Sequence, residues 1–103
     1  MEKSDKYELK LREEAVSDIK KAHQWHSEEE PSWGEAFLNE IESAKEIITK
    51  MPKAFPNKYK DYREYCLNNY PYVIIYTLIG NKITVFSVFH TSRSPNDRYP
   101  NEV

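Results

Sequence analysis

The sequence predicts an α+β domain in which an antiparallel β-sheet is covered on one face by an antiparallel helical hairpin. Between Glu13 and Met51, apolar residues recur every three or four positions, as they do in amphipathic helices. Between Tyr62 and His90 the chain is instead rich in aromatic and β-branched residues, which favour strands. A length of 103 residues fits one domain. We therefore expect a single domain over residues 1–103, with a core at about 7–95 and a tail at 96–103.

The first two expected elements are a strand and a helix. Apolar and polar residues alternate over Tyr7–Leu11, which predicts a half-buried strand added at an edge of the sheet. A helical period begins at Glu13, and the acidic pair Glu13 and Glu14 suits the positive end of a helix dipole. We expect this helix to end around Ser27–Pro31, because a proline disfavours helical geometry in the preceding residue.

A second helix is predicted from Ser32. Ser32 and Glu35 match the S-x-x-E capping box, which pairs backbone donors at a helix start. An apolar stripe then extends to Met51, and Pro52 stops the helix. The stripe consists of Phe37, Leu38, Ile41, Ala44, Ile48 and Met51. The short break between the helices implies an antiparallel hairpin.

Three strands complete the expected fold. They span Tyr62–Leu67, Tyr72–Ile79 and Lys82–His90, and the dipeptide Gly80-Asn81 forms a two-residue turn between the last two. If both hairpins have two-residue turns, Arg63 pairs with Ile74 and Ile74 pairs with Ser87. His90 would then face the opposite side of the sheet from Arg63.

Both long strands are apolar on both sides. Strict alternation places Phe86 and Val88 on one face of the last strand, and Val85 and Phe89 on the other. Two helices cover only one face of a sheet. The other face is therefore buried either by a protein partner or by this chain's own loop and tail, and both alternatives remain open.

Composition limits the class of protein. The net charge is -2, and the acidic residues concentrate in the first half of the chain, whereas seven of eight tyrosines lie from Tyr59 onward. The apolar runs are too short to span a membrane, and the first residues have no apolar signal segment, so we expect a cytoplasmic location. The single cysteine, Cys66, fits a reducing compartment and a core position. We expect no cofactor and no metal, because His23 and His26, with the flexible Glu29 and Glu30 nearby, make a poor ligand set.

The order and spacing of several residues carry a family resemblance. They are Pro52 with Phe55-Pro56, then Arg63, then Tyr70-Pro71-Tyr72, and finally the segment from His90 through Arg93 to Pro95. In these residues the chain resembles the RelE/ParE toxins of bacterial type II toxin–antitoxin systems, and the His90–Pro95 ending is closer to the ParE side. It departs from the family at Tyr70, where phenylalanine is usual, and near the end, where Tyr99 stands in place of a tryptophan.

The resemblance implies a toxin that a cognate antitoxin protein binds and neutralises, in a possible dimer or heterotetramer. ParE-like members are associated with DNA gyrase, whereas RelE-like members cut messenger RNA on the ribosome. The leading hypothesis is a non-catalytic, ParE-like gyrase inhibitor. An mRNA endonuclease is the alternative, and a non-toxic antitoxin-binding module is a third.

Each hypothesis assigns roles to the same few residues. A metal-free nuclease needs cations for phosphate and groups that transfer protons. The candidates are Arg63 and Arg93 for phosphate, His90 or Tyr99 for proton transfer, and Lys58 or Lys60 for support. The slightly acidic balance of the chain weighs against this chemistry. In the ParE-like hypothesis the residues that contact the target or the antitoxin are Arg63, Tyr72, Tyr76, His90 and Arg93.

Overall fold

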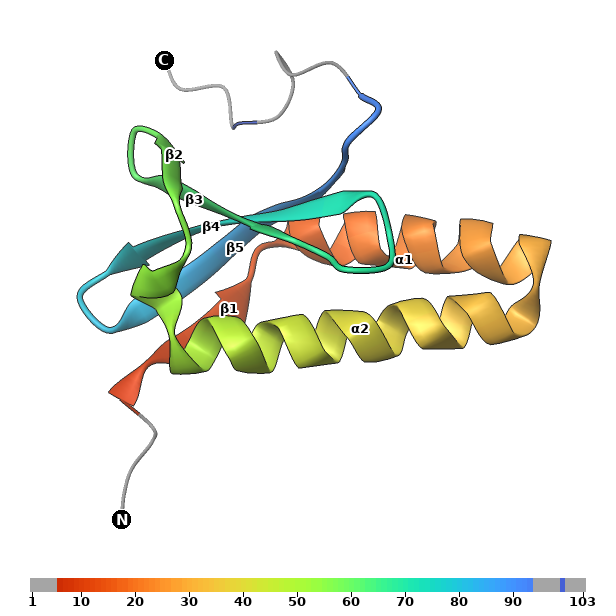
Figure 1. The fold of residues 1–103 in the computed structure, drawn as a ribbon, viewed down its shortest axis with the longest axis horizontal. Coiled ribbons are helices and arrows are strands. Elements are labelled where there is room, and N and C mark those ends of the chain that lie inside the picture. The colour runs from red at the N-terminus through yellow and green to blue at the C-terminus, as the bar shows by residue number, and fades with distance from the viewer. Residues whose placement is uncertain (1–5, 94–98, 100–103) are drawn as a thin grey trace.

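Two antiparallel helices pack across one face of a five-stranded sheet in the computed structural model, which describes residues 6–93 and 99 (Figure 1). The strand order is β1-β5-β4-β3-β2. The elements are β1 (Glu8–Leu11), α1 (Glu13–Glu29), α2 (Pro31–Lys50), the single turn η2 (Pro52–Ala54), β2 (Asn57–Tyr59), β3 (Tyr62–Cys66), β4 (Tyr72–Ile79) and β5 (Lys82–His90). The predicted α+β class, helical hairpin and three-stranded meander are confirmed.

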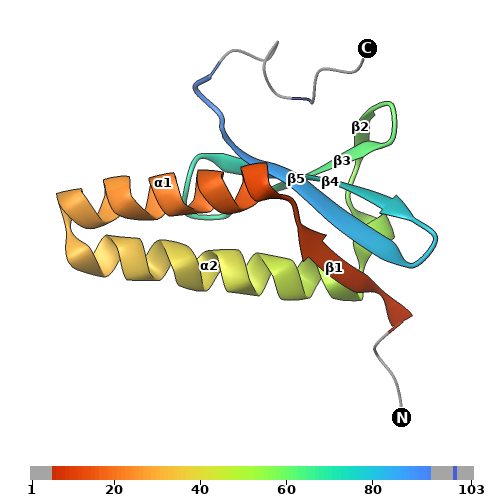
Figure 2. The same cartoon turned by 180° about the vertical axis from the view of Figure 1, so that it is seen from behind.

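The sheet is mixed, so the prediction of a wholly antiparallel sheet is wrong in one respect. β1 lies at the edge, as expected, but it runs parallel to β5, with Leu9 opposite Ile83 (Figure 2). A two-residue turn forces neighbouring strands to be antiparallel, whereas β1 and β5 are joined through both helices and three other strands. Their relative direction therefore depends on the tertiary fold.

A short strand, β2, was not expected. Its three residues are all exposed, so they show no apolar alternation. β2 pairs antiparallel with β3 through a turn in which Lys60 adopts a φ of 51°, in the left-handed region. In the described part of the chain, Lys60 is the one non-glycine residue with positive φ. The predicted loop after Pro56 is thus a short β-hairpin.

The second helix begins at Pro31, and its N-cap is Glu30, two residues before the Ser32 N-cap that the capping box predicts. No side chain caps α2, and the Ser32 hydroxyl lies instead 3.4 Å from a Glu30 carboxylate oxygen. Proline suits the first helical position because its fixed φ is already helical and its missing N–H has no intrahelical partner there. The capping-box prediction is therefore wrong. At the other end, Met51 is more than half exposed and does not continue the apolar stripe.

A β-bulge in β5 changes which residues face the helices. Ile75 lies opposite Ser87, but the next residue of β4, Tyr76, lies opposite Val85, so Phe86 is an extra residue. As a result, Val85 and Val88 both belong to the helix-side core, and the expected alternation is wrong.

The bulge also corrects the predicted relation between Arg63 and His90. Arg63 pairs with Tyr76 and His90 pairs with Tyr72. Tyr72 and Tyr76 are both in the helix-side core, and they are four residues apart on β4. Arg63 and His90 therefore lie on the same face of the sheet, separated by about 13 Å along the strand.

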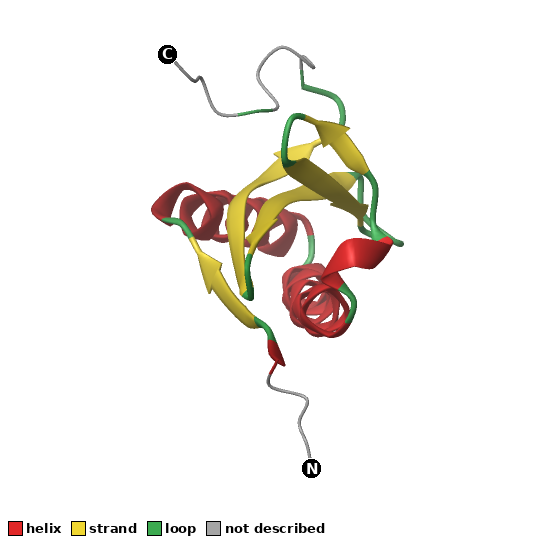
Figure 3. Cartoon of the chain, turned by 90° about the vertical axis from the view of Figure 1, so that its left-hand side faces the viewer, coloured by secondary structure: helices red, strands yellow, loops and turns green. Residues whose placement is uncertain are grey.

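The face of the sheet away from the helices is covered by the chain's own aromatic residues. The sheet curves over the helical hairpin (Figure 3). On its other side Tyr62, Val73, Ile75 and Phe89 form a second buried cluster, against which Phe86 and Tyr99 pack. Ile75 has no exposed surface. Of the two alternatives for this face, coverage by the chain itself agrees with the structure. Cys66 is exposed at the end of β3, so the expected core position is wrong.

A carboxylate on α2 anchors the turn between β3 and β4. The side chain of Glu40 accepts hydrogen bonds from the backbone N–H groups of Asn68 and Asn69 and from the Asn69 side-chain amide. These three bonds join the middle of the helix to the tip of the β3–β4 hairpin. Hydrogen bonds to a charged group stabilise more than neutral ones.

We expect Glu40→Ala to lower the free energy of unfolding by about 1.5–3 kcal/mol, because two backbone N–H groups lose a charged acceptor. Urea denaturation followed by circular dichroism measures the change. Glu42→Ala is the matched control, because Glu42 is exposed and, in the described part of the chain, its one ion pair is with Lys45. Its expected effect is below about 0.5 kcal/mol. Equal losses in both variants would show that the Glu40 contacts do not anchor the turn.

Candidate functional site

Three of the predicted site residues line one pocket between α1 and the end of β5. They are Tyr72, His90 and Arg93, and the pocket has a volume of about 180 Å³. Helix α1 contributes the rest of the polar lining, which includes Asp18 and Lys21. The sequence analysis singled out neither of these as a site residue. Ala22, Trp25 and Val88 complete the lining.

Asp18 fixes the helix to the edge of the sheet at this pocket. Its Oδ2 atom accepts the backbone N–H of Val88 at 2.9 Å. β1 stops pairing with β5 at Leu11, opposite Val85, so Asp18 satisfies an edge donor that β1 does not reach. Burial raises the pKa of Asp18, and the Val88 hydrogen bond partly opposes that shift.

His90 is held in one tautomer by the residue two positions later. The backbone N–H of Ser92 donates to Nδ1 of His90 at 3.1 Å, and the Ser92 hydroxyl lies 2.7 Å from the same atom. In the neutral ring the proton is then on Nε2, which acts as a donor. The ring meets that of Tyr72 edge-on, with 4.9 Å between centroids.

A cluster of aromatic rings packs around His26 and Tyr72, and Tyr72 lines the pocket. The Tyr72 hydroxyl is hydrogen-bonded to Nε2 of His26 at 3.3 Å, and the rings of Phe37 and Tyr70 lie within 5.4 Å of the His26 ring. Burial lowers the pKa of His26, and an electrostatic interaction with His90 lowers it further. One hint of this role is visible in the sequence, since His26 follows Ala22 by four residues on the apolar side of the helix.

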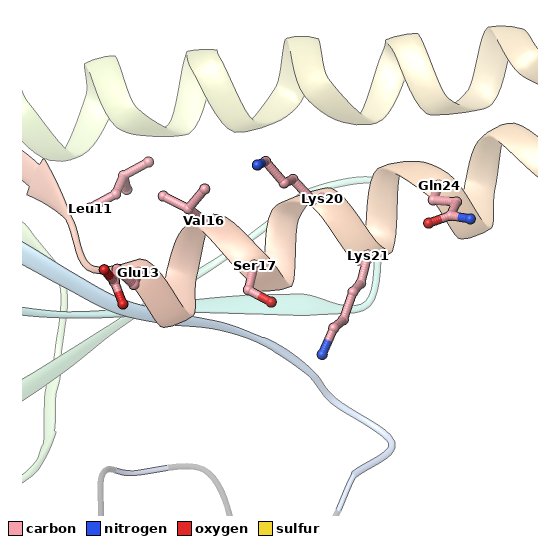
Figure 4. A pocket seen from close by; sticks show the side chains of 7 residues that line it. All are labelled: Leu11, Glu13, Val16, Ser17, Lys20, Lys21 and Gln24. Atoms are coloured by element: carbon pink, nitrogen blue, oxygen red, sulfur yellow. The ribbon is translucent and has the colours of Figure 1, made fainter.

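The two cations of the pocket come from different elements. Figure 4 shows a different pocket, along α1, and in it the Lys21 side chain extends from the helix to the opposite side from that of Lys20. Lys21 lines the pocket with His90 and Arg93, whereas Lys20 does not. The Arg93 guanidinium lies over the ring of Phe89, 4.8 Å from its centroid.

Arg63 and Tyr76 lie outside this pocket and hold the segment after α2. Nη1 of Arg63 donates to the carbonyl oxygens of Phe55 at 2.7 Å and Lys53 at 3.3 Å. The Tyr76 hydroxyl donates to the carbonyl of Pro52 at 2.7 Å. Tyr76 has no exposed surface, so its predicted contact with a target or antitoxin is wrong for this conformation.

The remaining nuclease candidates lie elsewhere. Tyr99 is on the face of the sheet away from the helices, where its hydroxyl donates to Glu64 and its ring stacks on Tyr59. Lys58 is an exposed residue of β2, and the ammonium of Lys60 lies 5.4 Å from the Tyr59 ring centroid. The structure therefore brings together Tyr72, His90 and Arg93 but not the others. Pro95, part of the family-like ending, lies outside the described residues.

Replacing Tyr76 with phenylalanine tests the structural role of its hydroxyl. We expect Tyr76→Phe to lower the free energy of unfolding by about 1–2 kcal/mol, because the Pro52 carbonyl loses its donor. Burial raises the pKa of Tyr76 to about 12. The folded state thus favours the neutral phenol, and this stabilisation is lost as pH rises from about 10 to about 12.

Urea denaturation between pH 8 and 12 measures both effects. The stability of the wild-type chain should fall more steeply above pH 10 than that of Tyr76→Phe, which lacks the titrating group. Parallel pH profiles for the two proteins would contradict the buried position of this hydroxyl.

Comparison with solved structures defines the class of this fold. A chain of the chromosomal ParDE toxin–antitoxin system from P. aeruginosa superposes with a TM-score of 0.63 at 14% identity, over 82% of this chain and 96% of that one. A chain of the archaeal RelE–RelB complex from Pyrococcus horikoshii gives a TM-score of 0.50 at 16% identity, over 86% of this chain and 99% of that one. This is the shared fold of the ParE and RelE toxins.

Sequence comparison identifies the family. The model of the ParE toxin of the type II toxin–antitoxin system parDE matches residues 9–95. The chain belongs to this family, and it is a toxin of a type II toxin–antitoxin system. No curated protein matches it significantly in sequence.

Two other classes of site receive no support from the described residues. No helix among them is long and apolar enough to cross a bilayer. Over residues 6–93 and 99, no three His, Cys, Asp or Glu side chains gather in a way that could hold a metal ion.

Proposed function

We propose that this toxin arrests growth by binding DNA gyrase in the cytoplasm, without cleaving RNA, and that a cognate antitoxin neutralises it. The observation that carries the proposal is the ParE family match over residues 9–95. The neighbouring structures are described as a ParDE system and a RelE–RelB complex, which supports a protein antitoxin as partner. The assembly with this antitoxin would be a dimer or heterotetramer.

The placement of the nuclease candidates supports a non-catalytic mechanism. Cleavage requires a phosphate-binding cation, a base and an acid around one reacting phosphate. Arg63 donates to two backbone carbonyls, about 13 Å along the sheet from His90. Tyr99 lies on the opposite face. These groups do not converge on one reacting centre in the described conformation.

The charge distribution also favours a protein target. Residues 1–50 contain 13 Asp and Glu against 8 Lys and Arg, a net charge of -5. Both helices belong to this half of the chain. A ribosome is a dense polyanion, and a surface of this sign is repelled by it.

The proposal is tested by pulse-labelling of DNA and protein synthesis within minutes of induction. We expect DNA synthesis to fall first, and we expect the purified chain to inhibit supercoiling by gyrase. The matched control is the same transcript with a stop codon in place of Glu13. Unimpaired supercoiling would overturn the gyrase proposal.

One observation favours an mRNA endonuclease as the second candidate. His90 and Arg93 share a pocket with Lys21, so a proton donor and two cations are close together. In that case protein synthesis falls before DNA synthesis. Harmless expression would instead support the third candidate, a non-toxic antitoxin-binding module.

A further inference from the structure

We propose that the pocket between α1 and β5 binds the carboxylate of a single Asp or Glu side chain of a partner protein. The proposal depends on the proposed function only in taking that partner to be the antitoxin. Its basis is the set of charged and donor groups that Lys21, His90 and Arg93 present in one small pocket.

The two cations, Lys21 and Arg93, interact electrostatically with Asp18, and among the described residues no carboxylate forms a salt bridge with either of them. Both residues are exposed. Guanidinium groups bind carboxylates in a planar, bidentate geometry, and an ammonium group adds a second positive charge.

The one carboxylate in the lining, that of Asp18, does not neutralise both cations. Asp18 lines the pocket, but its Oδ2 atom accepts the Val88 N–H at the strand edge. One carboxylate offsets one of the two cations, so the charge of the lining remains positive with His90 neutral. The Nε2–H of His90 adds a neutral hydrogen-bond donor, since Nδ1 accepts the backbone N–H of Ser92.

The size of the pocket and its apolar walls suit a side chain. A volume of about 180 Å³ is smaller than the pockets that hold drug-sized ligands. The rings of Trp25 and Tyr72 and the side chains of Ala22 and Val88 form apolar parts of its lining. The methylene groups of an Asp or Glu side chain would pack against these walls while its carboxylate meets the cations.

The surroundings select one isolated carboxylate over a nucleic-acid backbone. The first turn of α1 carries Glu13 and Glu14, and its last turn contains Glu28 and Glu29, which Glu30 follows. A chain of phosphates crossing the pocket would meet these acidic groups on either side. A protein segment with one acidic residue between neutral or basic neighbours meets no such repulsion.

A titration of the purified chain with sodium acetate tests the pocket directly. NMR follows the indole N–H of Trp25 and the Nε–H of Arg93, with sodium chloride at equal ionic strength as reference. We expect saturable shifts with acetate and none with chloride. Absent saturation, or saturation with inorganic phosphate alone, overturns the proposal.

Two lysines of α1 provide a matched pair of variants. Lys21→Glu should weaken acetate binding by about tenfold or more, whereas Lys20→Glu should change it by less than about twofold. Both residues are exposed and adjacent, but only Lys21 lines the pocket. Equal effects of the two variants overturn the assignment to this pocket. Arg93→Gln is a second variant, and the dispersion of the amide spectrum checks the fold of each.

The identity of the partner is tested by measuring how tightly the neutralising antitoxin binds variants of this chain. Lys21→Glu should weaken its binding by about tenfold, and an acidic-to-lysine change in the antitoxin should restore it. An antitoxin that binds Lys21→Glu and the wild-type chain equally overturns the partner assignment. These readouts do not involve gyrase, so failure of the gyrase proposal leaves them interpretable.

Discussion

Phe37→Ala is expected to lower the free energy of unfolding by about 3–5 kcal/mol, the usual cost of removing a large buried ring. Phe37 has no exposed surface and lies on α2 at the centre of the helix-side core. Its ring contacts those of His26, Tyr70 and Tyr72, which belong to α1, the β3–β4 turn and β4. The substitution therefore leaves a cavity where three parts of the fold meet.

Urea denaturation of the purified variant measures this loss. Trp33→Ala is the control, since Trp33 is 53% exposed on the same helix. The Trp33 carbonyl that accepts the Tyr70 hydroxyl is kept in this variant. We expect the control to cost less than about 1 kcal/mol. Comparable losses at the two positions would contradict the central position of Phe37 in the core.

Arg63→Ala is expected to lower the free energy of unfolding by about 2–3 kcal/mol and to reduce toxicity for that reason. The guanidinium donates hydrogen bonds to the carbonyls of Phe55 and Lys53, so its removal loosens the segment between α2 and β2. Arg63 also lies beside the buried Tyr76, whose hydroxyl bonds the same segment at Pro52. The loss should thus appear as instability of the purified protein.

Arg93→Ala provides the comparison that separates structure from function. Arg93 is exposed, and in the described residues its side chain contacts the ring of Phe89. We expect Arg93→Ala to change the free energy of unfolding by less than about 0.5 kcal/mol. If Arg63→Ala were as stable as the wild-type chain but had lost toxicity, Arg63 would have a direct role in toxicity and not only a structural one.

Elements with a strong local pattern were predictable from the sequence. The bounds of β4 and β5 agree with the predicted ranges, because Gly80 supplies the positive φ of 63° that a two-residue hairpin turn needs. β2 and the parallel direction of β1 have no comparable local signal. The start of α2 was misplaced because Ser32 matches a capping pattern that the neighbouring Pro31 makes unnecessary.

The candidate site was predictable only in part, and the bulge in β5 explains most of the difference. Because Phe86 is an extra residue, each residue beyond it in β5 faces the opposite side of the sheet from the one that strict alternation predicts. The predicted face of His90 was therefore wrong. Tyr72, His90 and Arg93 do meet in one pocket. The contribution of Asp18 and Lys21 depends on how α1 lies against the β5 edge, which helical periodicity does not determine.

The pairing of β1 with β5 has a consequence for how the chain acquires its structure during synthesis. The ion pair between Glu8 and Lys82 joins residues 74 positions apart, and the strands around them pair over the same separation. The helical hairpin rests on local contacts and can form early, whereas closing so long a loop is slow. A ribosome must release the chain through β5 before the sheet is complete. The newly made toxin therefore passes through an interval in which its helices exist but the pocket between Asp18 and Arg93 does not.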